Sequence, residues 1–153
     1  MPKDRGEYDL LDDVGFLLSR SSGLGVRAAN ASLVPLGLRV RSFSALSLVV
    51  TGDAMSQREL SELLGLDPSQ VVALVDDLEA QGLIERRPGS TDRRVRVLSA
   101  TRLGRTRMKT ASRVLADGQA IFLADLSQPE RDVLRELLRR IAFPATAEAE
   151  AVS

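Results

Sequence analysis

Apolar residues recur at helical spacing through residues 56–82 and predict two short helices, each with one apolar face. The first face comprises Leu60, Leu63 and Leu64, and the second comprises Val71, Leu74, Val75 and Leu78. Gly65 separates the two faces, and glycine readily adopts the left-handed conformation that ends a helix. The sequence therefore predicts two helices joined by a turn of about three or four residues, Gly65 to Pro68.

Both helices begin with a capping sequence. Ser56 and Glu59 have the spacing of a capping box, in which hydroxyl and carboxylate each accept a hydrogen bond from a free backbone N–H. Asp67 caps the second helix, and Gln70 completes a second box. Gly82 ends that helix. These local signals fix the boundaries independently of the apolar pattern.

After Gly82 the pattern changes to the alternation typical of strands, which predicts a β-hairpin. Its first strand covers Leu83–Arg87, and residues 88–91 are typical turn residues. Its second strand covers Arg94–Leu98, with valines facing one way and arginines the other. We therefore expect a small two-stranded wing directly after the two helices.

Two helices, a tight turn and a hairpin together indicate a winged helix-turn-helix, which sets one helix into the DNA major groove. Five arginines crowd the hairpin: Arg86, Arg87, Arg93, Arg94 and Arg96. Alone, they are equally consistent with a solvated edge strand whose charges prevent aggregation. Because they directly follow a helix-turn-helix, we favour contact with DNA phosphates or the minor groove.

Helical spacing of apolar residues continues on both sides of this motif. We expect helices over residues 8 to about 34, over 40–50, from Thr101 to about Phe122, and from a capped start at Ser127 to Ile141. They could fill the domain's own core, but they are more apolar than a lone winged helix needs. We favour pairing with a second chain, because a monomer reads too few base pairs for useful specificity. The sequence thus predicts one domain, with 8–50 and 101–142 as dimerisation and linking helices, 51–100 as the winged helix-turn-helix, and 143–153 as a flexible tail.

The formal net charge of zero is unevenly distributed along the chain. Residues 85–113 contain ten basic and two acidic side chains, so this segment carries +8 and the remainder carries −8. Electrostatic attraction to DNA depends on such a distribution rather than on the total charge. The sequence therefore predicts one basic face on an otherwise acidic protein.

The absent residue types exclude several functions. The chain has no cysteine and no histidine, which argues against disulfides, thiol-based redox sensing and zinc sensing. An enzyme is a weak alternative, since there is also no phosphate-binding glycine motif. No apolar run approaches the roughly 18 residues of a membrane span, and the acidic N-terminus lacks a signal-peptide core. We expect a cytoplasmic protein with no cofactor, no metal and no membrane partner.

The element order and several local motifs resemble the MarR family of transcription regulators. The motifs are Gln57-Arg58-Glu59-Leu60, Leu63-Leu64-Gly65, Val75-Asp76-Asp77-Leu78-Glu79, Gly82-Leu83-Ile84-Glu85-Arg86-Arg87, Asp92-Arg93-Arg94, and Thr101 followed by Gly104. The resemblance covers about residues 8–142. It implies a mainly α winged helix-turn-helix protein that dimerises through both termini. It also implies a regulator, usually a repressor, that binds a palindromic operator on double-stranded DNA and is often released by a small ligand.

The resemblance assigns DNA-reading roles to the helix Asp67–Gln81. Its outward N-terminal part carries Ser69, Gln70, Val72 and Ala73. Gln70 could make paired hydrogen bonds to adenine, and Val72 could contact a thymine methyl group. Ser56 and Gln57 lie at the start of the preceding helix, which is a favourable place for a phosphate.

The wing is matched residue by residue as well. Arg94 corresponds to the arginine that enters the minor groove, and Asp92 to the carboxylate that orients it as an ion-pair partner. Arg93 is expected to contact phosphate. Arg86 and Arg87 are expected either to do the same or to form a solvated strand end.

The recognition helix departs from the family pattern because it has no basic residue. Relatives often carry arginine at the position of Ala73 and a basic or polar group at that of Asp77. Here Asp76, Asp77 and Glu79 would repel phosphate if they faced it, although spacing places them away from the base-reading end. Affinity should then rest on the wing and the helix N-termini. A MarR-like dimer with weakened DNA specificity, acting as a protein-interaction module, is the alternative.

A small-molecule effector is implied only by the resemblance. In similar proteins the ligand lies between the first two helices and the long helix after the wing, near the dimer interface. The candidates in that region are Arg20, Arg27, Arg39, Arg41 and Phe43. An arginine there could bind an aromatic carboxylate through two hydrogen bonds, and solvated surface arginines are the alternative.

Overall fold

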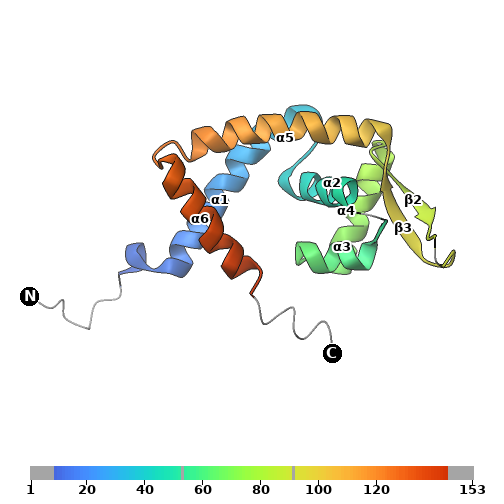
Figure 1. Ribbon diagram of the computed structural model, residues 1–153, viewed down its shortest axis with the longest axis horizontal. Coiled ribbons are helices and arrows are strands. Elements are labelled where there is room, and N and C mark those ends of the chain that lie inside the picture. The colour runs from blue at the N-terminus through green and yellow to red at the C-terminus, as the bar shows by residue number, and fades with distance from the viewer. Residues whose placement is uncertain (1–8, 53, 91, 145–153) are drawn as a thin grey trace, which may run out of the picture. The chain divides into compact units, whose positions relative to one another are not determined.

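The computed structural model describes residues 9–52, 54–90 and 92–144 (Figure 1). The helices are α1 (Val14–Leu33), α2 (Val40–Thr51), α3 (Gln57–Leu64), α4 (Pro68–Ala80), α5 (Arg102–Phe122) and α6 (Gln128–Ala142), with 3₁₀ turns η1 (Leu10–Asp12) and η2 (Val34–Leu36). The strands are β1 (Met55–Ser56), β2 (Ile84–Pro88) and β3 (Arg96–Ala100). The mainly α fold with a small hairpin is confirmed. The chain forms two compact units, one ending at Gln119 and one beginning at Ala120.

Two sequence predictions fall partly outside the described residues. The predicted tail, 143–153, is described only for Phe143 and Pro144. The first helix was expected from Tyr8, which is not described, but α1 begins at Val14 because the Asp13 carboxylate caps it, accepting a 2.7 Å hydrogen bond from the Phe16 N–H. The turn residue Thr91 also lies outside the described part.

The capping boxes of the helix-turn-helix are confirmed. The Glu59 carboxylate accepts a 2.7 Å hydrogen bond from the Ser56 N–H, while the Ser56 hydroxyl accepts one of 3.2 Å from the Glu59 N–H. At α4, the Gln70 side chain accepts a longer bond of 3.4 Å from the Asp67 N–H. Gly65 ends α3 in the left-handed conformation at φ 61°. The turn predicted from Gly65 to Pro68 is therefore present.

A third strand accompanies the wing and was not predicted. β1 pairs antiparallel with β3, so the strand order is β1-β3-β2, and Ser56 lies opposite Val97. A two-residue strand is too short to show an alternating pattern, so periodicity does not indicate it. Ser56 thus joins the sheet and caps α3 at the same time.

The second strand of the wing begins two residues later than predicted. The Gly89 N–H donates to the Val95 carbonyl at 2.7 Å, and the Val95 N–H donates to the Asp92 carbonyl at 3.1 Å. These bonds place Arg94 and Val95 in the turn. Within β3 the buried residues are Leu98 and Ala100, while Val97 is half-buried and Arg96 is exposed.

The base of the wing is joined tightly to α5. The Thr101 hydroxyl donates a 2.6 Å hydrogen bond to the Gly82 carbonyl and accepts one of 3.0 Å from the Gly104 N–H. A β-carbon on Gly104 would overlap the carbonyl oxygen of Leu83, so only glycine permits this approach. These contacts explain why threonine and glycine occur three residues apart. Figure 1 shows α5 continuing directly from β3.

The core gathers residues from the end of α1 through the middle of α5. Leu46, Leu60, Val75, Leu78 and Leu83 are completely buried in it. α5 is also tied to η2, because the Arg107 guanidinium donates to the Leu36 carbonyl. The helix-turn-helix, the wing base and the first part of α5 therefore form one packed body.

Other helices leave apolar side chains uncovered. Leu11, Val14, Leu17 and Leu18 are exposed at the start of the chain, and Val133, Leu137, Leu138 and Ile141 are exposed on α6. Among the described residues no single helix is long and apolar enough to cross a membrane. Val14–Leu36 and Val40–Thr51 meet that test only as a pair, bent by 71°.

Candidate nucleic-acid interface

The four predicted base-reading residues lie on the outer face of α4. Ser69, Gln70, Val72 and Ala73 are all exposed, whereas Val71, Val75 and Leu78 on the opposite face are completely buried. Val72 is 43% exposed although it is apolar. The structure therefore brings all four side chains to one surface that is free for a ligand in this chain.

The tip of the wing presents basic side chains to solvent. Arg93, Arg94 and Arg96 are exposed there. The expected ion pair between Asp92 and Arg94 does not occur; instead the Asp92 carboxylate accepts a 2.9 Å hydrogen bond from the backbone N–H of Arg94. In a tight turn, the main-chain N–H two residues on is closer to this short side chain than a guanidinium is. Asp92 thus shapes the turn that carries Arg94.

The neighbouring arginines of β2 differ from each other. Arg87 is 61% exposed and forms an ion pair of 2.5 Å with Glu85. The Arg86 side chain is only 22% exposed and forms ion pairs with Asp76, at 2.5 Å, and with Glu79. The solvated strand end expected as an alternative is therefore wrong for Arg86.

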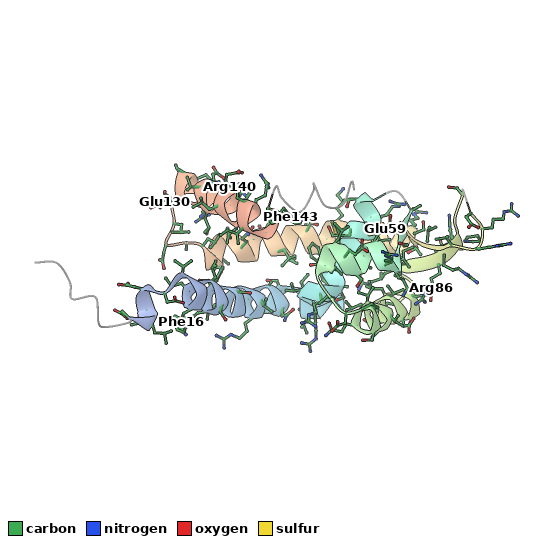
Figure 2. All side chains as sticks on the ribbon, turned by 90° about the horizontal axis from the view of Figure 1, so that it is seen from below. Phe16, Glu59, Arg86, Glu130, Arg140 and Phe143 are labelled. Atoms are coloured by element: carbon green, nitrogen blue, oxygen red, sulfur yellow. The ribbon has the colours of Figure 1, made fainter. Side chains whose placement is uncertain are left out.

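Arg86, which is labelled in Figure 2, lies at the centre of a polar cluster that joins the wing to both helices of the motif. Its Nε donates a 3.1 Å hydrogen bond to the Gln57 side-chain oxygen on α3, and its backbone N–H donates one of 3.2 Å to the Glu79 carboxylate. The hydrogen bond to Asp76, followed by Glu79, raises the pKa of the guanidinium above its ordinary value. Two of the acidic residues on α4 therefore face a cation within the same chain.

Ser56 and Gln57 are engaged within the protein as well. The hydrogen bonds from the Ser56 backbone and hydroxyl hold the pKa of Glu59 below its ordinary value, and the Gln57 side chain accepts from Arg86. Sequence reasoning overlooked Arg58 at this helix start, whose side chain is 89% exposed beside Glu62. Its place in the first turn of a helix that begins the motif was the available signal.

The five effector candidates are not all brought together. Arg20 and Arg27 line an open groove on α1 with Phe16, Ser19, Gly23 and Leu24. Arg39 and Arg41 are exposed around the start of α2, and Phe43 packs partly buried against the core. Within the described ranges, no three acidic side chains are grouped so that they could hold a metal ion.

Comparisons with known proteins agree with this arrangement. A sequence model described as "MarR family" matches residues 36–95. A MarR family transcriptional regulator from Rhodococcus sp. RHA1 is 38% identical, with a TM-score of 0.86 over 91% of this chain and 99% of that one. CouR from Rhodococcus jostii RHA1, solved with p-coumaroyl-CoA, is 39% identical, with a TM-score of 0.82 over 91% and 98%. The repressor Rv2887 of Mycobacterium tuberculosis is 27% identical over 134 residues, which are 86% of this chain and 96% of that protein. This chain belongs to the MarR family of transcriptional regulators.

Proposed function

We propose that the protein is a homodimeric transcriptional repressor that binds a palindromic operator in the cytoplasm and is released by a small ligand. The function is binding, without a catalytic step. One observation carries the proposal: the outer face of α4 and the arginines at the tip of the wing are both exposed on the same compact unit of the chain. Rv2887, a repressor, has been solved in complex with DNA, at 26% identity and a TM-score of 0.72 over 84% of this chain and 97% of that one.

In this proposal α4 reads bases and the wing reads the backbone and minor groove. Gln70 hydrogen-bonds adenine and Val72 contacts a thymine methyl, with Ser69 and Ala73 beside them. Arg94 enters the minor groove, and Arg93 and Arg87 contact phosphates. The exposure of these side chains supports the assignment.

Dimerisation is supported by the apolar residues that this single chain leaves exposed. On α1 they include Leu17 and Leu18, and on α6 they include Leu137 and Ile141. Apolar side chains gathered on the exposed face of an element usually mark an interface. We assign the dimer interface to residues 8–50 and 101–142 and the DNA-binding part to 51–100. Two-fold symmetry then places the two motifs on half-sites one helical turn apart.

For the effector we propose an aromatic carboxylic acid, as the free acid or as its coenzyme A thioester. CouR supports this class, because its structure contains p-coumaroyl-CoA. Arg20 and Arg27 line the α1 groove together with Phe16. The groove therefore presents two cationic side chains beside an aromatic ring. The groove is open because residues of a single helix line it, so a bound ligand would need contacts from a second element to be enclosed. Arg39, Arg41 and Phe43 do not line this groove, and the proposed site is therefore limited to Arg20 and Arg27 on α1.

The alternative of a protein-interaction module is not favoured. It was motivated by the acidic recognition helix, but Asp76 and Glu79 are paired with Arg86. The relative Rv2887 is a transcriptional repressor.

The proposal is tested by selecting from a random double-stranded DNA pool at about 150 mM salt, where weak non-specific binding is suppressed. We expect enrichment of a palindrome whose half-sites are about ten base pairs apart. Binding that shows no sequence preference and disappears as salt rises would overturn the proposal and favour the interaction module.

The effector is then tested on the selected operator. p-Coumaroyl-CoA, p-coumarate and coenzyme A are each added to the preformed complex. Release by p-coumarate alone indicates a free-acid effector, and release only by the thioester indicates an acyl-CoA effector. If none of the three releases the DNA, the proposed ligand class is wrong while the DNA-binding function stands.

A further inference from the structure

The acidic recognition helix and the half-buried Arg86 are two parts of one feature. Asp76 and Glu79 lie on α4, three residues apart and therefore on the same side of the helix. Both reach the guanidinium of Arg86 on β2. The third partner, Gln57, lies on α3. One side chain thus contacts both helices of the motif from the wing.

The geometry of this cluster helps to hold the position of the wing. The base of the hairpin is also held by its pairing with β1, by the buried Leu98 and Ala100, and by the joint with α5. The cluster adds a direct side-chain contact between β2 and α4. A guanidinium offers donors in a rigid planar fork, so binding three acceptors at once fixes direction as well as distance. The additional 3.2 Å hydrogen bond from the Arg86 backbone to Glu79 ties the strand itself to the helix.

We propose that Arg86 is a positioning residue, which sets the wing relative to α4 so that Arg94 and the base-reading face engage DNA together. Asp76 and Glu79 are its anchors, and their charge serves this contact instead of opposing DNA. This inference rests on the proposed DNA-binding function. It removes Arg86 from the phosphate-contacting residues expected from the sequence.

The decisive experiment is a double-mutant cycle between Arg86 and Arg94 on the selected operator. Methionine at position 86 keeps much of the side-chain volume and removes the donors. We expect Arg86→Met to weaken binding by about tenfold, and Arg94→Ala to cost less than about threefold in that background although it costs more than tenfold in wild type. A merely structural role for Arg86 would leave the two effects additive, which would overturn the proposal.

Salt dependence separates positioning from direct contact. Loss of one phosphate contact lowers the slope of log K against log salt by about one. The slope is measured in the Arg94→Ala background, where loss of the Arg94 contact cannot contribute, and there we expect Arg86→Met to leave it unchanged. The matched control is Arg87→Met, which removes the adjacent, exposed arginine of β2; its effect on affinity should be additive with that of Arg94→Ala. A slope reduced by about one when Arg86→Met is added to Arg94→Ala would reassign Arg86 to a phosphate.

The sign of a third change is also diagnostic. Neutralising an acid near DNA ordinarily strengthens binding, because repulsion of phosphate is removed. We expect Glu79→Gln to weaken binding, since an anchor of Arg86 is lost, and to add little once Arg86→Met is present. Stronger binding would overturn the anchoring role. Wild-type protein that binds no DNA would instead refute the proposed function itself, and the two failures are therefore distinguishable.

Discussion

The base and the tip of the wing contain the same kind of residue in opposite environments. At the base, the Arg86 side chain is 22% exposed and forms ion pairs with two carboxylates. Leu98 and Ala100 are buried beside the joint with α5. At the tip, Arg93 and Arg94 are exposed on a turn. Arginines of the hairpin thus have two roles: at the base they attach the wing to the rest of the protein, and at the tip they are exposed to a ligand. Acidic side chains on other elements determine which role an arginine has.

The largest effect should come from the joint at the base. We expect Gly104→Ala to lower the free energy of unfolding by about 1–3 kcal/mol or more, because the new β-carbon overlaps the Leu83 carbonyl. Thermal unfolding measured by circular dichroism reports the loss. The control is Gly23→Ala within α1, where no atom lies within 4 Å of the added carbon; it should stabilise by up to about 1 kcal/mol. An unchanged melting temperature for Gly104→Ala would refute the tight joint.

A change at the tip should affect binding and leave stability alone. We expect Arg94→Ala to lower operator affinity by more than about tenfold with an unchanged melting temperature, since the side chain is exposed. Fluorescence anisotropy with labelled operator measures the affinity. Arg135→Ala on α6 removes an equally positive, exposed side chain outside the proposed DNA-binding part and, once shown to dimerise as wild type does, should have little effect. Equal losses in both variants would mean that only total charge matters.

Gln70 tests whether α4 adds sequence reading to the contacts of the tip. We expect Gln70→Ala to reduce the difference in binding free energy between operator and random DNA by about 1–3 kcal/mol. Gln81→Ala is the control, because its amide donates to Asp77 at the other end of the helix. Competition binding against random DNA gives this difference for each variant. A difference of wild-type size in Gln70→Ala would remove the base-reading assignment.

The smallest effect concerns the capping box beside β1. The pKa of Glu59 is lower in the folded protein than its ordinary value of 4.5. The ionised carboxylate therefore stabilises the fold when the pH is above 4.5, and this contribution is lost as the pH falls through the folded-state pKa. Between about pH 5 and 3, the melting temperature of Glu59→Gln should therefore fall slightly less than that of wild type. Glu130→Gln, at the matching box of α6, should behave alike. A steeper fall in either variant would contradict the sign.

Local signals in the sequence were sufficient for the helix-turn-helix. Ser56 with Glu59, Asp67 with Gln70 and the left-handed Gly65 act over three or four residues, so their outcome does not depend on the rest of the fold. The outward face of α4 followed from helical periodicity in the same way. These elements and surfaces were predicted correctly.

The wing was harder to predict because its details depend on residues distant in the sequence. The start of β3 is set by bonds across the turn to Gly89, and β1 is stabilised only by pairing with β3. The cluster around Arg86 joins residues 57, 76, 79 and 86. These residues are too far apart in the sequence for a local pattern to indicate their contact. The expected ion pair between Asp92 and Arg94 does not form, because the backbone N–H of Arg94 is closer to the Asp92 carboxylate and donates to it instead.

At the contact between Gly104 and Leu83, α5 and the hairpin meet backbone to backbone, with no side chain between them. The angle between the two elements therefore matters for the position of the tip. A strand of five residues reaches about 17 Å, and a tilt of about 10° at its base moves the far end by about 3 Å, roughly the length of a hydrogen bond. A tilt of that size would therefore separate a side chain at the tip from a hydrogen-bonding partner in a groove.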